Sequence, residues 1–367
     1  MNIGRRGFIA GSLATSAGAL LPSSAFGQAA FAPKPEKWRS FDITTRLDLA
    51  AKDGASQAWL PLPSVREDAW MKPNGADWRT NGKATVFKSG SHAPGMLRVE
   101  WTASEKAPFV ELTNRIATRD RSVDLDKREA SAPLSSTERK FYLAATDLIP
   151  TDGIVKQTSD KITAGARTDV DKARAIYEWV VDNSFRRAST RGCGIGDVAA
   201  MLKSGDLGGK CADLNALFVG LSRAAGLPAR DVYGIRIAPS KFGYKSLGAN
   251  SDTITKAQHC RAEVWLDGHG WTPMDPADVR KVVLEEPPGN LAVGDAKVPA
   301  ARKTLFGAWE GNWLAYNFAH DVALPGSNGP RLGFLMYPQA EVAGLRLDCL
   351  DPDTFRYTIK TKETTAI

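Results

Sequence analysis

Cys211 has the local setting of a nucleophilic cysteine. It follows Gly208, Gly209 and Lys210 and stands where a predicted helix begins. The unpaired backbone N–H groups and the positive end of the dipole at a helix start favour thiolate over thiol, and the adjacent lysine adds to this. The glycines allow a tight turn and a close approach of a substrate carbonyl. The alternative is a buried structural cysteine, but Cys211 lies at the helix start and not on the apolar face.

His259 and Asp275 are the predicted partners of this thiol. A thiolate nucleophile needs a base or imidazolium partner and a group that orients the ring. Of four histidines, His259 heads a convincing strand, 48 residues after Cys211. Asp275 follows 16 residues later across a hairpin turn, so antiparallel pairing would bring carboxylate and imidazole side by side. The order predicts a Cys-His-Asp triad, against the alternative of a purely structural histidine.

The other three cysteines leave several interpretations open. Cys193 could be a redox partner of Cys211, one half of a disulfide or a packed thiol. Cys260 points to the strand face opposite its neighbour His259, so we interpret it as a core residue or as paired with another cysteine. If Cys211 stays a thiolate, at most one disulfide can form among Cys193, Cys260 and Cys349.

The remaining polar candidates favour structural roles. His269 falls in a turn and is expected to be solvated, and His92 carries no signal in its Ser/Gly/Pro loop. His320 and Asp321 are adjacent, and adjacent strand residues face opposite ways. Asp213 lies two residues past Cys211, where a carboxylate favours the start of a helix.

No metal or cofactor motif occurs in the sequence. It contains no Cys-x-x-Cys, His-Glu-x-x-His, phosphate-loop, dinucleotide-binding or calcium-loop pattern. We therefore expect neither a cofactor nor a metal at the candidate site.

The elements that would position the triad are predicted from residue 168 onward. Helical spacing runs through 169–181, with Thr168 or Asp169 as N-cap, and through 211–225. Three short strands follow, at 232–237, 259–266 and 271–275. The Gly/Ser/Lys-rich loop 239–257 between the first two strands is a place where substrate contacts often occur.

Strand patterns dominate both ends of the chain. Alternating apolar residues predict strands in 41–49, 97–101 and 110–118, separated by turn residues such as Pro73-Asn74-Gly75. A small antiparallel β domain is the simplest interpretation. A last section, 300–367, carries further strands and a group of aromatic residues that we expect to pack in the core, namely Trp309, Trp313, Tyr316 and Phe318.

The first thirty residues resemble a twin-arginine export signal. Arg5-Arg6 form the basic start, Phe8–Leu21 a weakly apolar middle, and Ala25-Phe26-Gly27 a cleavage point. Pro22 keeps the apolar run shorter than the roughly 20 residues that a membrane span needs.

Composition describes an ordinary globular protein. Its 367 residues suggest two or three domains, and 43% apolar with 8% aromatic residues argue against disorder. The formal charge is +7; removing Arg5 and Arg6 with the signal leaves 46 basic against 41 acidic residues, or +5. A modest excess spread along the chain is a poor match to a nucleic-acid partner.

Three ordered motifs resemble the transglutaminase-like superfamily, whose core shares its architecture with papain-type cysteine proteases. They are G-G-K-C-A-D-L-N-A-L-F-V-G-L-S-R-A-A-G-L-P-A-R around Cys211, Q-H-C-R-A-E-V-W at His259 and G-H-G-W-T-P-M-D-P at Asp275. The resemblance spans about residues 168–280. It implies that Cys211 is the acyl-accepting nucleophile, His259 the general base and acid, and Asp275 its orienting partner. The family's side-chain oxyanion donor matches no residue, so only the backbone N–H of Cys211 can be named.

With this resemblance we expect an α+β fold: a papain-like core with an N-terminal antiparallel β domain and a C-terminal β-rich extension. The expected division is a signal at 1–27, the β domain at 36–130, the catalytic core at 135–290 and the extension at 300–367.

The expected function is that of an exported, periplasmic thiol enzyme acting on peptide or protein amides through a thioester, most simply a cysteine peptidase or amidase. Its expected partner is a peptide or protein substrate, with the cell envelope as one source, and we expect no nucleic-acid partner and no membrane span after signal cleavage. Two alternatives stay open: a protein-crosslinking transglutaminase, and a catalytically silent module that binds the cell envelope.

Overall fold

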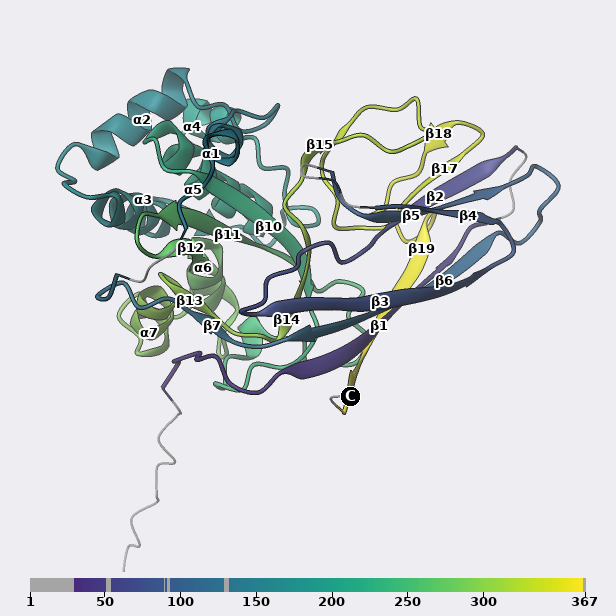
Figure 1. Ribbon diagram of the computed structural model, residues 1–367, viewed down its shortest axis with the longest axis horizontal. Helices are drawn as coiled ribbons and strands as arrows, with labels where there is room; N and C mark the ends of the chain where they lie inside the picture. The colour runs from purple at the N-terminus through teal and green to yellow at the C-terminus, as the bar shows by residue number, and fades with distance from the viewer. Residues whose placement is uncertain (1–29, 51–53, 89, 91–92, 129–131, 366–367) are drawn as a thin grey trace, which may run out of the picture.

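The computed structural model describes residues 30–50, 54–88, 90, 93–128 and 132–365 (Figure 1). The predicted signal at 1–27 and His92 lie outside the described residues. Figure 1 shows two bodies side by side: one holds the helices around a small sheet, and the other is built from strands at both ends of the chain.

The described elements have the following bounds. The helices are α1 (Ser136–Leu143), α2 (Gly153–Thr163), α3 (Asp169–Asn183), α4 (Val198–Ser204), α5 (Cys211–Ala224), α6 (Pro276–Glu285), α7 (Lys297–Thr304) and the 3₁₀ turn η1 (Lys245–Leu247). The strands are β1 (Arg39–Asp48), β2 (Ser56–Pro61), β3 (Met71–Thr80), β4 (Lys83–Phe87), β5 (Met96–Trp101), β6 (Phe109–Thr118), β7 (Arg121–Ser122), β8 (Phe185–Arg186), β9 (Gly208–Gly209), β10 (Ala229–Arg236), β11 (Gln258–Leu266), β12 (Gly270–Met274), β13 (Ala308–Trp309), β14 (Trp313–Asn317), β15 (His320–Val322), β16 (Leu332–Phe334), β17 (Gln339–Val342), β18 (Leu345–Arg346) and β19 (Arg356–Thr364).

The core sheet has the order β12-β11-β10-β14, and all its neighbouring strands are antiparallel. Helix α5 packs on one face, where Leu217, Phe218 and Leu221 share an apolar cluster with Ala262 and Val264 of β11. Every residue of α5 is buried, because the sheet covers one side and α2, α3, α4 and α6 contact the others. The sequence predicted only one apolar face. A helix buried on all sides lies at the centre of a core, which gives Cys211 a rigid support.

Helix α3 follows its sequence pattern closely. Thr168 caps it by accepting a hydrogen bond from Asp171 N, and the Asp171 side chain accepts one from Thr168 N in return. This reciprocal arrangement satisfies two of the N–H groups that a helix start leaves open. The predicted apolar residues of this helix are all buried, namely Ala173, Ile176, Tyr177, Val180 and Val181.

The opposite face of the core sheet packs against the strand-built body. One apolar cluster joins Val232 and Ile235 of β10 to Phe41 and Ile43 of β1. Trp309, Trp313 and Tyr316, each 1% exposed, belong to the same cluster, so their predicted packing role is confirmed. The core sheet is therefore covered on both faces, which explains why β10 is buried at every position.

Two sheets form the strand-built body. Their orders are β19-β1-β6-β3 and β18-β17-β2-β5-β4. Strands from the last section of the chain complete both sheets: β19 pairs with β1 from Ser40↔Thr364 to Asp48↔Arg356, and β17 pairs with β2. Another strand of that section, β14, joins the core sheet. The section 300–367 thus contributes to both bodies, and the domain boundaries stay predictions.

One predicted turn is wrong. Pro73-Asn74-Gly75 lies inside β3, where the pairing with β6 shifts register between Pro73 and Ala76. Gly75 has φ +98°, a conformation that glycine adopts without strain. Turn-forming residues therefore produce a bulge here, which bends a strand without ending it.

Helices and antiparallel sheets in separate parts of the chain confirm the predicted α+β class. In the part of the chain that the structure describes, no helix has the length and apolar character needed to cross a bilayer.

Candidate active site

Cys211 is the first residue of α5. As the first helical residue, it has a backbone N–H with no acceptor inside the helix. The preceding Lys210 N donates to Asp213 Oδ2 at 2.9 Å. A Cβ at Gly209 would come within 2.4 Å of the same oxygen. Glycine at that position therefore lets the chain turn tightly against the helix start.

Asp213 also ties a second segment to the nucleophile. Its Oδ1 accepts from the backbone N–H groups of Ile195 and Gly196, both at 2.9 Å, and Ala212 N donates to Cys193 O at 2.9 Å. Burial raises the pKa of Asp213, although the backbone donors act in the opposite direction. Asp213 is thus more than a helix-start carboxylate: it holds the Cys193 segment beside Cys211.

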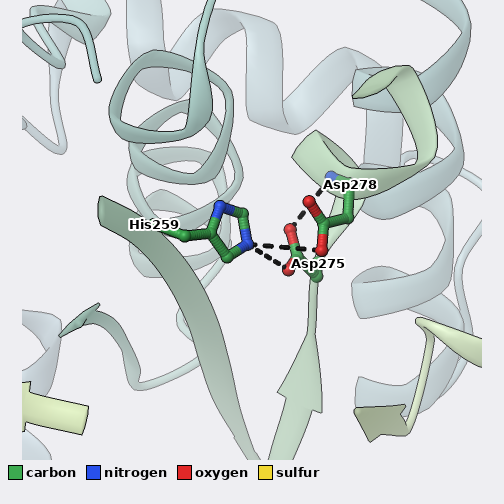
Figure 2. A group of neighbouring side chains, drawn as sticks. All are labelled: His259, Asp275 and Asp278. Atoms are coloured by element: carbon green, nitrogen blue, oxygen red, sulfur yellow. Dashed lines mark hydrogen bonds and ion pairs between the residues drawn. The ribbon is translucent and has the colours of Figure 1, made fainter. Parts of the chain in front are cut away.

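His259 lies between Cys211 and two carboxylates. Its Nε2 is 2.8 Å from Asp275 Oδ2 and 3.4 Å from Asp278 Oδ2. Figure 2 shows this nitrogen turned to both carboxylates and the other ring nitrogen turned away from them. Trp313 Nε1 donates to the backbone oxygen of His259 at 3.0 Å, so the indole helps to fix the strand that carries the imidazole.

Asp275 and His259 are not directly opposite each other in the hairpin but are offset by two residues. The register pairs Ala262 with Met274, so the position opposite Asp275 is that of Arg261, and His259 lies two residues further along. Asp275 is also the N-cap of α6, where its side chain accepts from Asp278 N. Asn215 Nδ2 donates to its Oδ1 at 3.3 Å. The structure brings the predicted His-Asp pair together, although not directly across the ladder.

Sequence reasoning missed Asp278 and Arg236. Asp278 lies one turn into α6, and its Oδ1 accepts from Arg236 Nη2 at 2.5 Å. Arg236 also donates to Leu247 O in the 239–257 loop. The only local signal was the three-residue spacing of Asp275 and Asp278, which is typical of a helix start. The burial of both carboxylates, each at most 1% exposed, was not visible in that spacing.

Three thiols meet at the start of α5. Cys260 Sγ is 3.6 Å from Cys211 Sγ, and Cys193 Sγ donates to Gln258 O at 3.4 Å. Cys193, Cys211 and Cys260 are buried in one cluster with Tyr337, and Cys349 packs against it. All four cysteines are free thiols in the structure. Cys260 is a buried residue, as predicted, but it contacts the nucleophile candidate itself.

The environment of Cys211 favours its thiolate. Burial raises the pKa of this thiol, but hydrogen bonds with Cys193, Cys260 and His259 outweigh burial and hold the pKa well below its usual value. Burial and the charge of Arg236 lower the pKa of His259, while Asp278 and Asp275 raise it to about 9. Both shifts favour a thiolate–imidazolium pair.

The two carboxylates differ in their own titration. Burial raises the pKa of Asp275, and repulsion from Asp278 adds to this. Burial also disfavours the charge on Asp278, but Arg236 and His259 outweigh it and hold the pKa of Asp278 well below its usual range. Of the two carboxylates beside the imidazolium, Asp278 is therefore the one that ionises more readily.

The acidic pair is arranged as an ion-pair network and not as a metal site. Ligand atoms of His259, Asp275 and Asp278 lie within 4.8 Å of one another. However, Arg236 already bonds Asp278, and Arg261 Nε is 3.7 Å from Asp275 Oδ2. Arg236 and Arg261 therefore already neutralise the two carboxylates, and their positive charges would repel a metal cation at this position.

A cavity of about 920 Å³ opens over the thiol and the imidazole. Both Cys211 and His259 line it, together with residues 248–250 and 253–258 from the predicted substrate loop and residues 355–358 at the start of β19. A peptide segment fits a space of this size. The cavity gives a carbonyl group access to the otherwise buried thiol.

The other polar candidates lie elsewhere. His320 Nδ1 is 3.3 Å from the Tyr233 hydroxyl and Nε2 is 3.5 Å from Asp231 Oδ2. Asp321 accepts from Asp147 N, so the adjacent pair serves two different contacts, as the strand geometry predicted. His269 is half-buried in its hairpin turn, where the sequence had suggested a solvated side chain.

Comparison with known proteins agrees with this geometry. Residues 156–276 match the Transglutaminase-like superfamily. An uncharacterized protein of Haemophilus influenzae is 36% identical over 340 residues, which cover 88% of this chain and 91% of that protein. The crystal structure of a candidate cysteine protease from Cytophaga hutchinsonii matches with a TM-score of 0.51 at 14% identity, covering 89% of this chain and 99% of that one. At that identity the likeness is one of fold.

Proposed function

Because the chain belongs to the transglutaminase-like superfamily, we propose that it is an exported thiol enzyme that cleaves or transfers the acyl groups of peptide or protein amides. Water is the expected acceptor, which makes it a cysteine peptidase or amidase. One observation carries the proposal: the Cys211 thiol lies at a helix start and lines an open cavity together with the imidazole of His259, which two buried carboxylates hold.

In this mechanism the Cys211 thiolate attacks the carbonyl carbon of the substrate amide. Negative charge then develops on the carbonyl oxygen, and the backbone N–H of Cys211 is the donor that we assign to it. The His259 imidazolium gives its proton to the leaving amine, which departs as the C–N bond breaks and leaves a thioester on Cys211. Water then attacks the thioester, with the neutral imidazole accepting its proton, and the thiolate leaves.

Asp275 and Asp278 act through His259 in this scheme. Their carboxylates accept from Nε2, so that the opposite ring nitrogen is turned away from them. We assign that second nitrogen to the thiol, and the two carboxylates stabilise the imidazolium. They are positioning residues, because neither needs to contact the substrate.

The proposed compartment is the periplasm, and the proposed partner is a peptide or protein substrate. The twin-arginine pattern at Arg5-Arg6 supports export to the periplasm, where a peptide or protein of the cell envelope would be the substrate. Replacing the pair, as Arg5→Lys with Arg6→Lys, should leave the protein unprocessed in the cytoplasmic fraction, as followed by immunoblot. Normal processing of that variant would exclude the twin-arginine route.

The activity test uses a library of fluorogenic peptide amides. The wild-type protein should release fluorophore from a subset of the library, and Cys211→Ala should reduce the rate by at least about 10³-fold, the size of effect seen when a catalytic nucleophile is removed. Circular dichroism checks that the variant is folded. Full activity in folded Cys211→Ala would exclude this residue as the nucleophile.

A crosslinking transglutaminase is the second candidate, since a thioester can be resolved by an amine as well as by water. Adding dansylcadaverine to a cleavable peptide separates the two. Hydrolysis predicts a carboxylic acid product with the dye in solution, whereas transamidation predicts dye covalently attached to the peptide. Binding of envelope material with no reaction on Cys211 would favour the silent binding module instead.

A further inference from the structure

Among the charged side chains that line the cavity above Cys211, cations outnumber carboxylates. Asp353 is the one carboxylate among the described residues that line it. The cationic lining residues are Arg186, Arg191, Lys210, Arg236, Lys256, Lys281 and Arg356.

Four of these cations are paired with three carboxylates of the protein. They form ion pairs with carboxylates behind or beside the cavity wall: Arg191 with Asp348 at 2.6 Å, Arg236 with Asp278 at 2.5 Å, Lys281 with Glu285 at 3.4 Å, and Arg186 with the same Glu285. These four side chains form part of the cavity wall, and the carboxylates that pair with them offset most of their positive charge.

Lys210, Lys256 and Arg356 are different. None of the three has a carboxylate oxygen within 4.0 Å in the described part of the chain, since no ion pair includes them. Lys210 adjoins Cys211, and Lys256 lies three residues before His259. Arg356 opens β19, where its Nε donates to Pro352 O at 3.1 Å. The unpaired cations therefore flank the proposed reaction centre.

The wall that carries Lys256 and Arg356 is held by hydrogen bonds. Ile254 N donates to Ile359 O and Thr361 N donates to Asp252 O, each at 2.8 Å. Ile359 N in turn donates to Thr255 Oγ1 at 2.9 Å. The loop thus runs antiparallel along β19, so both cations project from one paired structure. A cleft lined by one sign of charge concentrates ligands of the opposite sign.

We propose that this cavity selects an acidic peptide, with carboxylate side chains flanking the amide that Cys211 attacks. This inference rests on the proposed function, because acyl transfer requires an amide or related acyl group and the three cations then bind the neighbouring carboxylates. Charge-assisted hydrogen bonds to lysine and arginine are about twice as strong as neutral ones. A neutral or basic peptide would leave Lys210, Lys256 and Arg356 unpaired.

The first test measures the field at the thiol without any peptide. The rate of alkylation of Cys211 is followed with iodoacetate, an anion, and with iodoacetamide, its neutral counterpart, and the modified cysteine is mapped by mass spectrometry. The double variant Lys256→Gln/Arg356→Gln should lower the iodoacetate-to-iodoacetamide rate ratio about tenfold at low salt, the lower end of electrostatic steering. High salt should shrink this difference.

The matched control removes two positive charges from β19 at positions outside the cavity. Lys360→Gln/Lys362→Gln changes two exposed β19 lysines that do not line it, and it should leave the rate ratio within about twofold of the wild-type value, since exposed distant charges are screened. An unchanged ratio in Lys256→Gln/Arg356→Gln, or an equal fall in the control, would overturn the proposal.

The second test compares fluorogenic peptide amides that differ only by Glu against Gln on both sides of the cleaved bond. The acidic peptide should have the higher kcat/KM, mainly through KM, and the cavity double variant should remove that advantage. Equal kcat/KM for both peptides contradicts the acidic preference while leaving the proposed function intact. Anion-selective alkylation of Cys211 without cleavage of any peptide amide contradicts the proposed function while leaving the cationic cavity intact.

Discussion

Replacing Asp278 by asparagine should lower the pKa of His259 with little change in shape. Asp278 Oδ2 lies 3.4 Å from His259 Nε2, and the two carboxylates together raise the pKa of this imidazole from 6.5 to about 9. At 1.36 kcal/mol per pKa unit, that shift is worth about 3 kcal/mol. An opposite charge at this distance accounts for about 1 to 3 units, so we expect the pKa of His259 to fall from about 9 to between about 6 and 8.

The same change should alter how stability depends on pH. The pKa of His259 is raised in the folded state, so its contribution is complete below the unfolded value of 6.5 and is lost as pH rises through about 9. In Asp278→Asn the remaining contribution should be lost at a lower pH, no higher than about 8. Urea unfolding at a series of pH values measures this, as the pH at which the free energy of unfolding starts to fall.

The direct assay is an NMR titration with ¹⁵N-labelled histidine. The chain has four histidines, and the ring signal of His259 is identified as the one missing in His259→Gln. Asp278→Asn also leaves Arg236 without its partner, so the double variant Asp278→Asn/Arg236→Gln serves as control. Removing the Arg236 charge, which lowers the pKa of His259, should raise it again. A folded Asp278→Asn with an unchanged His259 pKa would refute the reasoning.

The remaining predictions concern the supports of the site. Gly194→Ala should lower the free energy of unfolding by at least about 2 kcal/mol in urea titrations, because φ is +94° and the new Cβ would lie 1.9 Å from Asp213 Oδ2; an unchanged midpoint would contradict the packing. Trp313→Phe removes the hydrogen bond to His259 O and should cost about 1 kcal/mol in the same measurement; no loss would mean that water replaces the indole. The iodoacetamide rate at Cys211 should persist well below the usual pKa of a thiol and fall only in acid, because the neighbours of this thiol lower its pKa; a profile with the ordinary thiol midpoint near 9 would contradict the ion pair.

Local sequence patterns were enough to locate the candidate triad. The glycines before Cys211 and the apolar spacing after it define a helix start within a few residues. His259 and Asp275 belong to one hairpin, whose short turn brings the two strands together without help from the rest of the chain. Their meeting could therefore be predicted, although the offset of two residues could not, because it depends on where the ladder ends and α6 begins.

The supporting charges depend on distant contacts. Arg236 and Asp278 are 42 residues apart, and their pairing requires β10 and α6 to pack against each other. The thiol of Cys193 approaches Cys211 only because Asp213 holds the loop 193–196. Periodicity along one segment carries no information on such contacts, so the raised pKa of His259 could not be read from the sequence.

The sheet pairings show the same limit. The residue pattern predicted a strand at 41–49 and further strands in 300–367, but such a pattern does not identify the strand with which each one pairs. The structure pairs β1 with β19 across more than 300 residues and places β14 in the core sheet. The pairing of β1 with β19 affects the site, because β19 forms the part of the cavity wall that includes Arg356.

The central claim is that Cys211 accepts an acyl group, and the most direct measurement is to trap that group. The protein is acylated with N-acetyl-glutamyl p-nitrophenyl ester, quenched in acid and digested with pepsin at acid pH, where the thioester persists, and the peptide that contains Cys211 is identified by mass spectrometry. We predict one acyl group on that peptide, removed by hydroxylamine and absent in Cys211→Ala. Acylation at Cys193, Cys260 or Cys349 instead, or an acyl group that persists in Cys211→Ala, would contradict the account.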